Sequence, residues 1–90
     1  MRFEWDAAKA AANLEKHGIT FEEASTVFAD ELSLTYQDPD SADETRYLVF
    51  GRSSAGRYLV VVHAERSGII RIISARRLTP KERRDYEQLR

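Results

Sequence analysis

Residues 57–76 read RYLVVVHAERSGIIRIISAR, and they indicate the central hairpin of a β-sheet. Two runs rich in β-branched residues flank a Ser-Gly dipeptide at 67–68, which is typical of a β-hairpin with a two-residue turn. We therefore expect antiparallel strands at residues 57–65 and 69–76. The run LVVV at residues 59–62 is too apolar for an edge strand, so the hairpin is expected to lie inside a larger sheet.

Two further strands are expected before this hairpin. Apolar and polar residues alternate from residue 32 to residue 36, as in a half-buried strand, and residues 46–52 form the next run. Residues 38–41, DPDS, predict a turn between these strands, and residues 53–56 predict a hairpin loop. The four strands then follow one another as an antiparallel meander.

The lengths of the two hairpin loops predict the register. The two-residue turn places His63 opposite Ile72 and Val61 opposite Ser74, and the four-residue loop places Arg46 opposite His63. One face of the sheet then carries Arg46, His63, Glu65, Ser74 and Arg76 together with Leu48, Phe50, Leu59, Val61, Ile70 and Ile72. The second face is also largely apolar, so it must be covered by a helix of this chain or by another protein.

Helices are expected on both sides of the strands in the sequence. Residues 7–17 are rich in helix formers between Asp6, a plausible N-cap, and Gly18, a plausible C-terminal glycine. Within this helix Ala7, Ala10, Ala11 and Leu14 form an apolar stripe at helical spacing. Residues 20–23 and 79–82 both fit a capping box, so a second and a third helix begin there. The result is an α+β fold of one domain, residues 1–90: two N-terminal helices, a four-stranded antiparallel meander sheet and a C-terminal helix.

The composition is that of a globular domain. The chain has 90 residues, 42% hydrophobic and 32% charged, and it has no cysteine, so disulfides and thiol chemistry are excluded. No run of apolar residues is long enough to cross a membrane, and the first residues, MRFEWD, do not resemble a secretory signal. We expect a cytoplasmic protein that makes no membrane contact.

The net charge of −1 hides an uneven distribution. Residues 1–45 hold 3 basic and 11 acidic side chains, whereas residues 46–90 hold 11 basic and 4 acidic ones. Ten of those basic residues are arginines, whose planar fork suits phosphate groups. The asymmetry indicates either a nucleic-acid or charged partner, or an ordinary solvated surface that evens out when the halves pack together.

Several classes of site are excluded by the motifs. The chain has no glycine-rich phosphate loop, and its two histidines lack the spacing of a zinc pair. The acidic turn at residues 38–44 lacks the glycine that a calcium loop needs at its sixth position, so we expect neither a metal nor a cofactor. Metal-free cleavage of RNA remains possible with Arg, Lys, His and Ser: a base removes the 2′-hydroxyl proton and cations stabilise the phosphorane.

Motifs along nearly the whole chain resemble one family, the BrnT toxins of bacterial type II toxin–antitoxin modules. The resembling residues are Phe3-Glu4-Trp5-Asp6, Lys9, Asn13, Lys16-His17-Gly18, Phe21-Glu22-Glu23-Ala24, Val27-Phe28, Ile70-Arg71-Ile72-Ile73-Ser74-Ala75-Arg76-Arg77, Glu82-Arg83 and Tyr86-Glu87. The pairing of an early W-D…K-H-G with a late R-I-I-S-A-R is the specific part of the match.

The resemblance implies a fold related to RelE-type toxins and a ribonuclease that blocks translation and slows growth. It also implies a BrnA-like antitoxin with a ribbon-helix-helix DNA-binding part, in a complex of two toxins with two antitoxins that represses its own promoter by binding operator DNA. The alternative is a non-catalytic interaction module or co-repressor that stabilises a DNA-binding partner.

The candidate catalytic residues are Arg76, Ser74, His17 and Lys16. Arg76 stabilises the scissile phosphate or ties the sheet to the last helix through Glu82 or Glu87, and Ser74 contacts substrate or bonds locally. His17 and Lys16 supply a base and a cation, or simply cap their helix.

A second group is expected to bind RNA backbone, to bind an acidic antitoxin segment, or to form a solvated face. Its members are Arg71, Arg77, Lys81, Arg83 and Arg84. Trp5 either anchors the first helix or stacks on a base.

Overall fold

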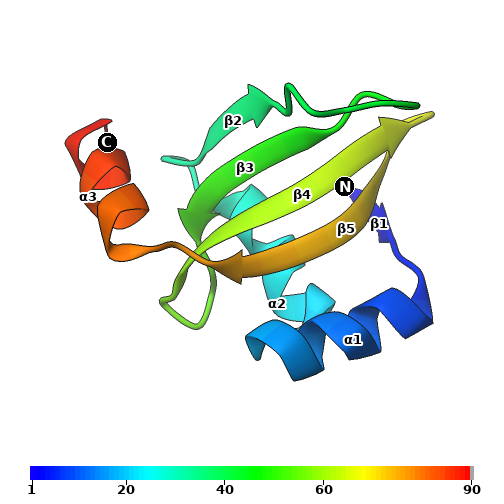
Figure 1. The fold of residues 1–90 in the computed structure, drawn as a ribbon, viewed down its shortest axis with the longest axis horizontal. Helices are drawn as coiled ribbons and strands as arrows, with labels where there is room; N and C mark the ends of the chain where they lie inside the picture. Colours follow the sequence, from blue (N-terminus) through cyan, green and yellow to red (C-terminus); the bar gives the residue numbers. More distant parts are fainter. Residues whose placement is uncertain (90) are drawn as a thin grey trace.

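The computed structural model describes residues 1–89 and contains a mixed sheet and three α-helices (Figure 1). The elements, in chain order, are β1 (Arg2–Glu4), α1 (Ala7–His17), α2 (Phe21–Thr26), the 3-10 turn η1 (Val27–Ala29), β2 (Leu34–Gln37), β3 (Tyr47–Arg52), β4 (Tyr58–Arg66), β5 (Ile69–Arg77) and α3 (Pro80–Leu89). The α+β fold and the antiparallel meander of β2 to β5 are confirmed.

The sheet has a fifth strand that the sequence did not reveal. Its strand order is β1-β5-β4-β3-β2, and β1 runs parallel to β5, with Arg2 paired to Ile69 and Glu4 to Arg71. The expected four-stranded, purely antiparallel sheet is therefore corrected to a five-stranded mixed one. Three residues are too few to show an alternating pattern, and the pairing of β1 depends on a partner strand near the other end of the chain.

The register of β4 and β5 changes halfway along the pair. His63 lies opposite Ile72 as expected, but Val62 lies opposite Ser74, so the expected pairing of Val61 with Ser74 is wrong. Ile73 is the extra residue of a β-bulge at this point. Relative to β4, an extra residue turns every later side chain of β5 to the opposite face of the sheet. The bulge turns Ser74 and Arg76 to the face opposite Ile72.

The loop between β3 and β4 also differs from the expectation. It has five residues rather than four, because Arg52 pairs with Tyr58 and Tyr47, not Arg46, lies opposite His63. The turn closes through the Ser53 N–H, which donates to the Arg57 carbonyl at 2.8 Å, and Gly56 takes a positive φ of 82° within it. The odd length exchanges the predicted faces of β3 relative to β4.

One face of the sheet is covered by α1 and α2, as Figure 1 shows. The core between these layers joins residues of the helical segment with residues of β3, β4 and β5: Ile19, Phe21, Ala24, Val27, Val49, Leu59, Val61, Ile72 and Ala75. Trp5 packs edge-on against Phe21, with ring centroids 6.0 Å apart, which supports its role as an anchor.

His63 lies on this helix-covered face and is 3% exposed. Its ring meets Phe28 edge-on at 4.8 Å and stacks on Tyr47 at 5.6 Å. The expectation that His63 shares a face with Ser74 and Arg76 is therefore wrong, because the bulge separates them. Burial lowers the pKa of His63, and its Nδ1 atom has no hydrogen-bond partner within residues 1–89.

The opposite face carries Leu48, Phe50, Val60 and Val62, and no α-helix of the described chain lies along its centre. At one end of it α3 packs beside β2 and β3. The Tyr86 hydroxyl donates to the Leu32 carbonyl at 3.0 Å and so fixes α3 to the segment that leads into β2.

Candidate active site

A hollow on the face of the sheet opposite α1 and α2, called here the cationic pocket, brings together all four candidate catalytic residues. Its polar lining consists of Lys16, His17, Ser74, Arg76 and Glu82, and its apolar floor of Leu48, Phe50, Val60 and Val62. The hollow measures about 420 Å³ and is open to solvent. Residues from the end of α1 and from the end of β5 therefore meet in one place.

The pocket residues of α1 and β5 are brought together by a direct contact between these two elements. Asn13 is 6% exposed; its Nδ2 donates to the Ala75 carbonyl at 2.9 Å and its Oδ1 accepts from the Ala75 N–H at 3.1 Å. The side-chain amide thus pairs with β5 as a neighbouring strand does, beyond the point where β1 ends. Because Ala75 lies between Ser74 and Arg76, this contact sets both residues relative to the end of α1.

Most of the apolar stripe expected on α1 does not face the sheet. Ala10 packs on the core and Asn13 is buried, whereas Leu14 is 48% exposed. The expected caps are confirmed: Asp6 accepts from the Lys9 N–H, and Gly18 adopts a left-handed φ of 70°. The helix therefore begins and ends as expected but turns a polar residue inward.

Arg76 both lines the pocket and forms the ion pair with Glu82. Its Nη1 donates to Glu82 Oε1 at 2.8 Å and its Nη2 to Glu82 Oε2 at 3.0 Å, while Nη1 also donates to the Arg77 carbonyl at 3.1 Å. Within residues 1–89 the Nε–H and the second Nη2 hydrogen have no protein acceptor. Glu82 therefore occupies the two Nη atoms at the end of the guanidinium. The Nε–H and the remaining Nη2 hydrogen on its side stay free, and two parallel donors of this kind suit phosphate.

The sequence predicts Glu82 as the glutamate of a capping box and as a possible salt-bridge partner of Arg76, but not as a pocket residue. Its Oε1 also accepts from the Thr79 N–H at 2.8 Å, and the Glu82 N–H donates to Thr79 Oγ1 at 3.1 Å, so the capping box is confirmed. The Arg76 guanidinium, followed by the Thr79 N–H, lowers the pKa of Glu82 to about 2. This carboxylate is ionised at neutral pH, and the capping box was the signal that placed it at the start of α3.

The other three polar groups of the cationic pocket are available to a ligand. Lys16 is exposed and His17 half-buried, and the structure gives neither side chain a hydrogen bond or ion pair with another described residue. The Ser74 hydroxyl is equally without a partner among residues 1–89, so its expected local hydrogen bond is not seen.

The five arginines and lysines expected to bind RNA do not gather around the pocket. Arg71 lies at the other end of β5, 3.7 Å from Glu4. Lys81 pairs with Asp85 at 2.9 Å, and Arg83 pairs with Glu87 at 2.9 Å and lies over the Tyr58 ring. Arg77 and Arg84 are exposed. The basic side chains that line the pocket are therefore Lys16, His17 and Arg76, and none of the five residues expected to bind RNA is among them.

Neither a metal site nor a membrane-spanning helix is found in the part of the chain that the structure describes. No group of three or more His, Asp or Glu side chains is arranged to hold a metal ion. In the acidic turn, Glu44 instead accepts from Arg66 at 2.7 Å. No helix among residues 1–89 is both long and apolar enough for a membrane crossing.

Comparison with known proteins bears on the family and on the fold. The family described as "Ribonuclease toxin, BrnT, of type II toxin-antitoxin system" matches residues 5–82. Among solved structures, the 1.1 Å crystal structure of the Brucella abortus ribonuclease toxin BrnT is similar, with a TM-score of 0.66 and 22% identity, over 88% of this chain and 97% of that one. The search of curated proteins found no match. Because the family match spans most of the sequence, this chain belongs to the BrnT ribonuclease toxin family of type II toxin–antitoxin systems.

Proposed function

We propose that this chain is a metal-independent endoribonuclease that inhibits translation and growth by cutting RNA in the cationic pocket. The observation that carries the proposal is the convergence of Lys16 and His17 with Ser74 and Arg76 on one open hollow. These pairs lie far apart in the sequence, and only the bulge in β5 turns the second pair toward the first.

Each group has a place in a transesterification. The free side edge of Arg76 binds two oxygens of the scissile phosphate, and the Ser74 hydroxyl donates to the same group. His17 takes the proton of the ribose 2′-hydroxyl as the new bond from the 2′-oxygen to phosphorus forms. As the bond from phosphorus to the 5′-oxygen breaks, Lys16 donates a proton to that leaving oxygen. The products are a 2′,3′-cyclic phosphate and a 5′-hydroxyl.

Membership in a type II toxin family implies a cognate antitoxin as partner. We propose that it is a BrnA-like protein with a ribbon-helix-helix part, that two toxins and two antitoxins assemble, and that the complex represses its own promoter. The apolar residues on the open face of the sheet support an additional protein contact, because surface of this kind is costly to leave in water.

Cleavage of a single-stranded RNA by the purified chain in EDTA tests the enzymatic proposal. We expect cutting by the wild type and a loss of at least about 100-fold in rate for Arg76→Ala, because a missing phosphate donor costs a few kcal/mol in the transition state. His17→Ala and Lys16→Ala are expected to reduce cutting as well.

Arg46→Ala is the matched control, since Arg46 lines the separate hollow of the acidic turn. Wild-type protein that cuts nothing but still binds the antitoxin and strengthens its hold on operator DNA would instead establish the co-repressor alternative.

A further inference from the structure

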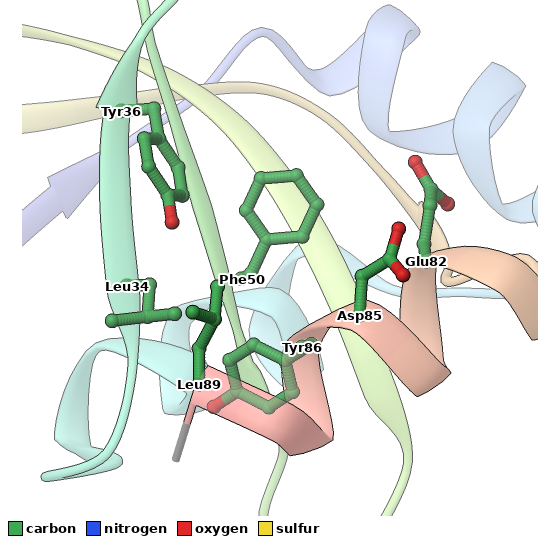
Figure 2. Close-up of a pocket in the computed structure, with 7 residues that line it drawn as sticks. All are labelled: Leu34, Tyr36, Phe50, Glu82, Asp85, Tyr86 and Leu89. Atoms are coloured by element: carbon green, nitrogen blue, oxygen red, sulfur yellow. The ribbon is translucent and has the colours of Figure 1, made fainter.

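A second hollow, called here the aromatic cleft, lies between α3 and the outer strands of the sheet. Leu34, Tyr36 and Phe50 line it from β2 and β3, and Tyr86 and Leu89 line it from α3, as Figure 2 shows. It measures about 180 Å³, and carboxylates of Glu82 and Asp85 stand on its α3 side.

The aromatic cleft lies next to the cationic pocket. Phe50 and Glu82 line both hollows, so one layer of side chains separates the phosphate-binding fork of Arg76 from the aromatic rings. A cationic groove beside aromatic side chains is the arrangement by which proteins hold single-stranded nucleic acid.

One ring of the cleft, that of Tyr36, is exposed for contact, whereas the Tyr86 ring is buried. Tyr36 is 48% exposed, and its ring forms a T-shaped pair with Phe50 at 5.8 Å between centroids, so Phe50 leaves at least one face of the Tyr36 ring uncovered. Leu89, across the cleft, is 63% exposed. A flat aromatic ligand placed here covers apolar surface that the described chain leaves open.

We propose that the aromatic cleft is a nucleobase subsite, which binds the base of a nucleotide adjacent to the scissile phosphate. The proposal rests on the proposed function and adds where the substrate's base is held. The small volume and the carboxylates at its edge suit one planar base with polar edges rather than the apolar side of a helix.

Asp85 gives the subsite a preference among bases. Its Oδ2 accepts from Lys81 at 2.9 Å, and Oδ1 has no partner among the described residues, whereas both Glu82 oxygens are held by Arg76. A carboxylate oxygen accepts from the exocyclic amino group of guanine, adenine or cytosine, a group that uracil lacks. We expect amino-bearing bases to bind more tightly than uracil.

The test uses deoxydinucleotides, which have no 2′-hydroxyl and cannot be cut. Probes with guanine, uracil or no base on either side of the phosphate are titrated into the folded chain, and dissociation constants are measured by NMR. Guanine on one side is expected to bind roughly five-fold or more tightly than the abasic probe, given the usual contribution of one stacked base. Tyr36→Ala removes this gain, and Asp85→Asn reduces the difference between guanine and uracil.

Leu14→Ala is the matched control, because Leu14 is exposed to the same extent as Tyr36 and lines neither hollow. Equal affinity of base-bearing and abasic probes overturns the subsite. So does a Tyr36→Ala variant that binds all probes normally but loses its antitoxin, since the cleft is then a protein-docking site. If the wild type cuts RNA but shows no base dependence, only the subsite fails; if it cuts no RNA, the proposed function fails.

Discussion

Glu82 holds Arg76 through both carboxylate oxygens, at 2.8 and 3.0 Å, and leaves the Nε edge of the guanidinium without a protein acceptor among residues 1–89. A flexible arginine is thereby fixed at its end while its side edge remains for an anion. The same carboxylate closes the first turn of α3 through Thr79. One residue therefore docks the helix and orients the proposed phosphate-binding group.

The first prediction concerns Glu82→Gln. The amide offers one acceptor oxygen in place of two, so we expect kcat for RNA cleavage to fall roughly ten-fold or more with a smaller change in KM, since one weakened positioning contact is worth about 1.5–3 kcal/mol. The free energy of unfolding is expected to fall by about 1–2 kcal/mol for the same reason.

The free energy of unfolding measured at low pH tests whether this loss of stability comes from the ionised Glu82 carboxylate. Because the pKa of Glu82 is lowered from 4.5 to about 2, its pairing stabilises the fold above pH 4.5 and is lost as the pH falls toward 2. The difference in unfolding free energy between wild type and Glu82→Gln should shrink over that range. Glu87→Gln, which removes an exposed pair with Arg83 on the same helix, is the control and should keep full cleavage activity.

The second prediction concerns Asn13. Replacing it with alanine leaves the Ala75 N–H and carbonyl without their side-chain partner and removes the bond to the Ile19 carbonyl. We expect a loss of about 2–4 kcal/mol in urea unfolding, because each buried group left unpaired costs about 1–3 kcal/mol. Leu14→Ala, one position along the same helix, should change stability by less than about 0.5 kcal/mol. A small effect of Asn13→Ala would show that the amide does not hold α1 on β5.

These residues show what the sequence reveals and what it hides. The helix ends were predictable because Asp6, Gly18, Thr20 and Thr79 act through neighbours within a few positions. The Ile73 bulge was not, since no local pattern marks an extra residue inside an apolar run. This one residue turns Ser74 and Arg76 to the face opposite His63, whereas the prediction placed all three side chains on one face.

The candidate site follows the same division. The family motifs selected Lys16, His17, Ser74 and Arg76, and these are the residues that meet in the cationic pocket. The basic residues of α3 were grouped only because they are close in sequence, and helix geometry pairs Lys81 and Arg83 with acids four positions later instead. Glu82 and Phe50 were missed as lining residues, because only the tertiary fold brings them beside the pocket.

The third prediction concerns His63. Burial among Phe28 and Tyr47 lowers its pKa below the ordinary value of 6.5, so the unfolded chain takes up a proton at a higher pH than the folded one. Stability should be highest above pH 6.5, should fall as the pH is lowered from 6.5 to the folded-state pKa, and should level off below it. His63→Phe should remove this component of the pH dependence in unfolding curves, whatever its effect at pH 8. An unchanged slope would mean that folding does not shift the pKa of His63.

The last prediction concerns Arg76→Lys, which keeps the positive charge and removes the fork. A lysine ammonium can still pair with Glu82, so we expect the free energy of unfolding to change by less than about 1 kcal/mol, as for a partly exposed ion pair. It has no second edge for the phosphate while that pair is made, because its donors share one nitrogen atom. Cleavage should therefore fall about as far as in Arg76→Ala, by at least roughly 100-fold. Activity close to wild type in Arg76→Lys would show that the positive charge alone is sufficient. The proposal that one edge of the guanidinium pairs with Glu82 while the other binds the phosphate would then be wrong.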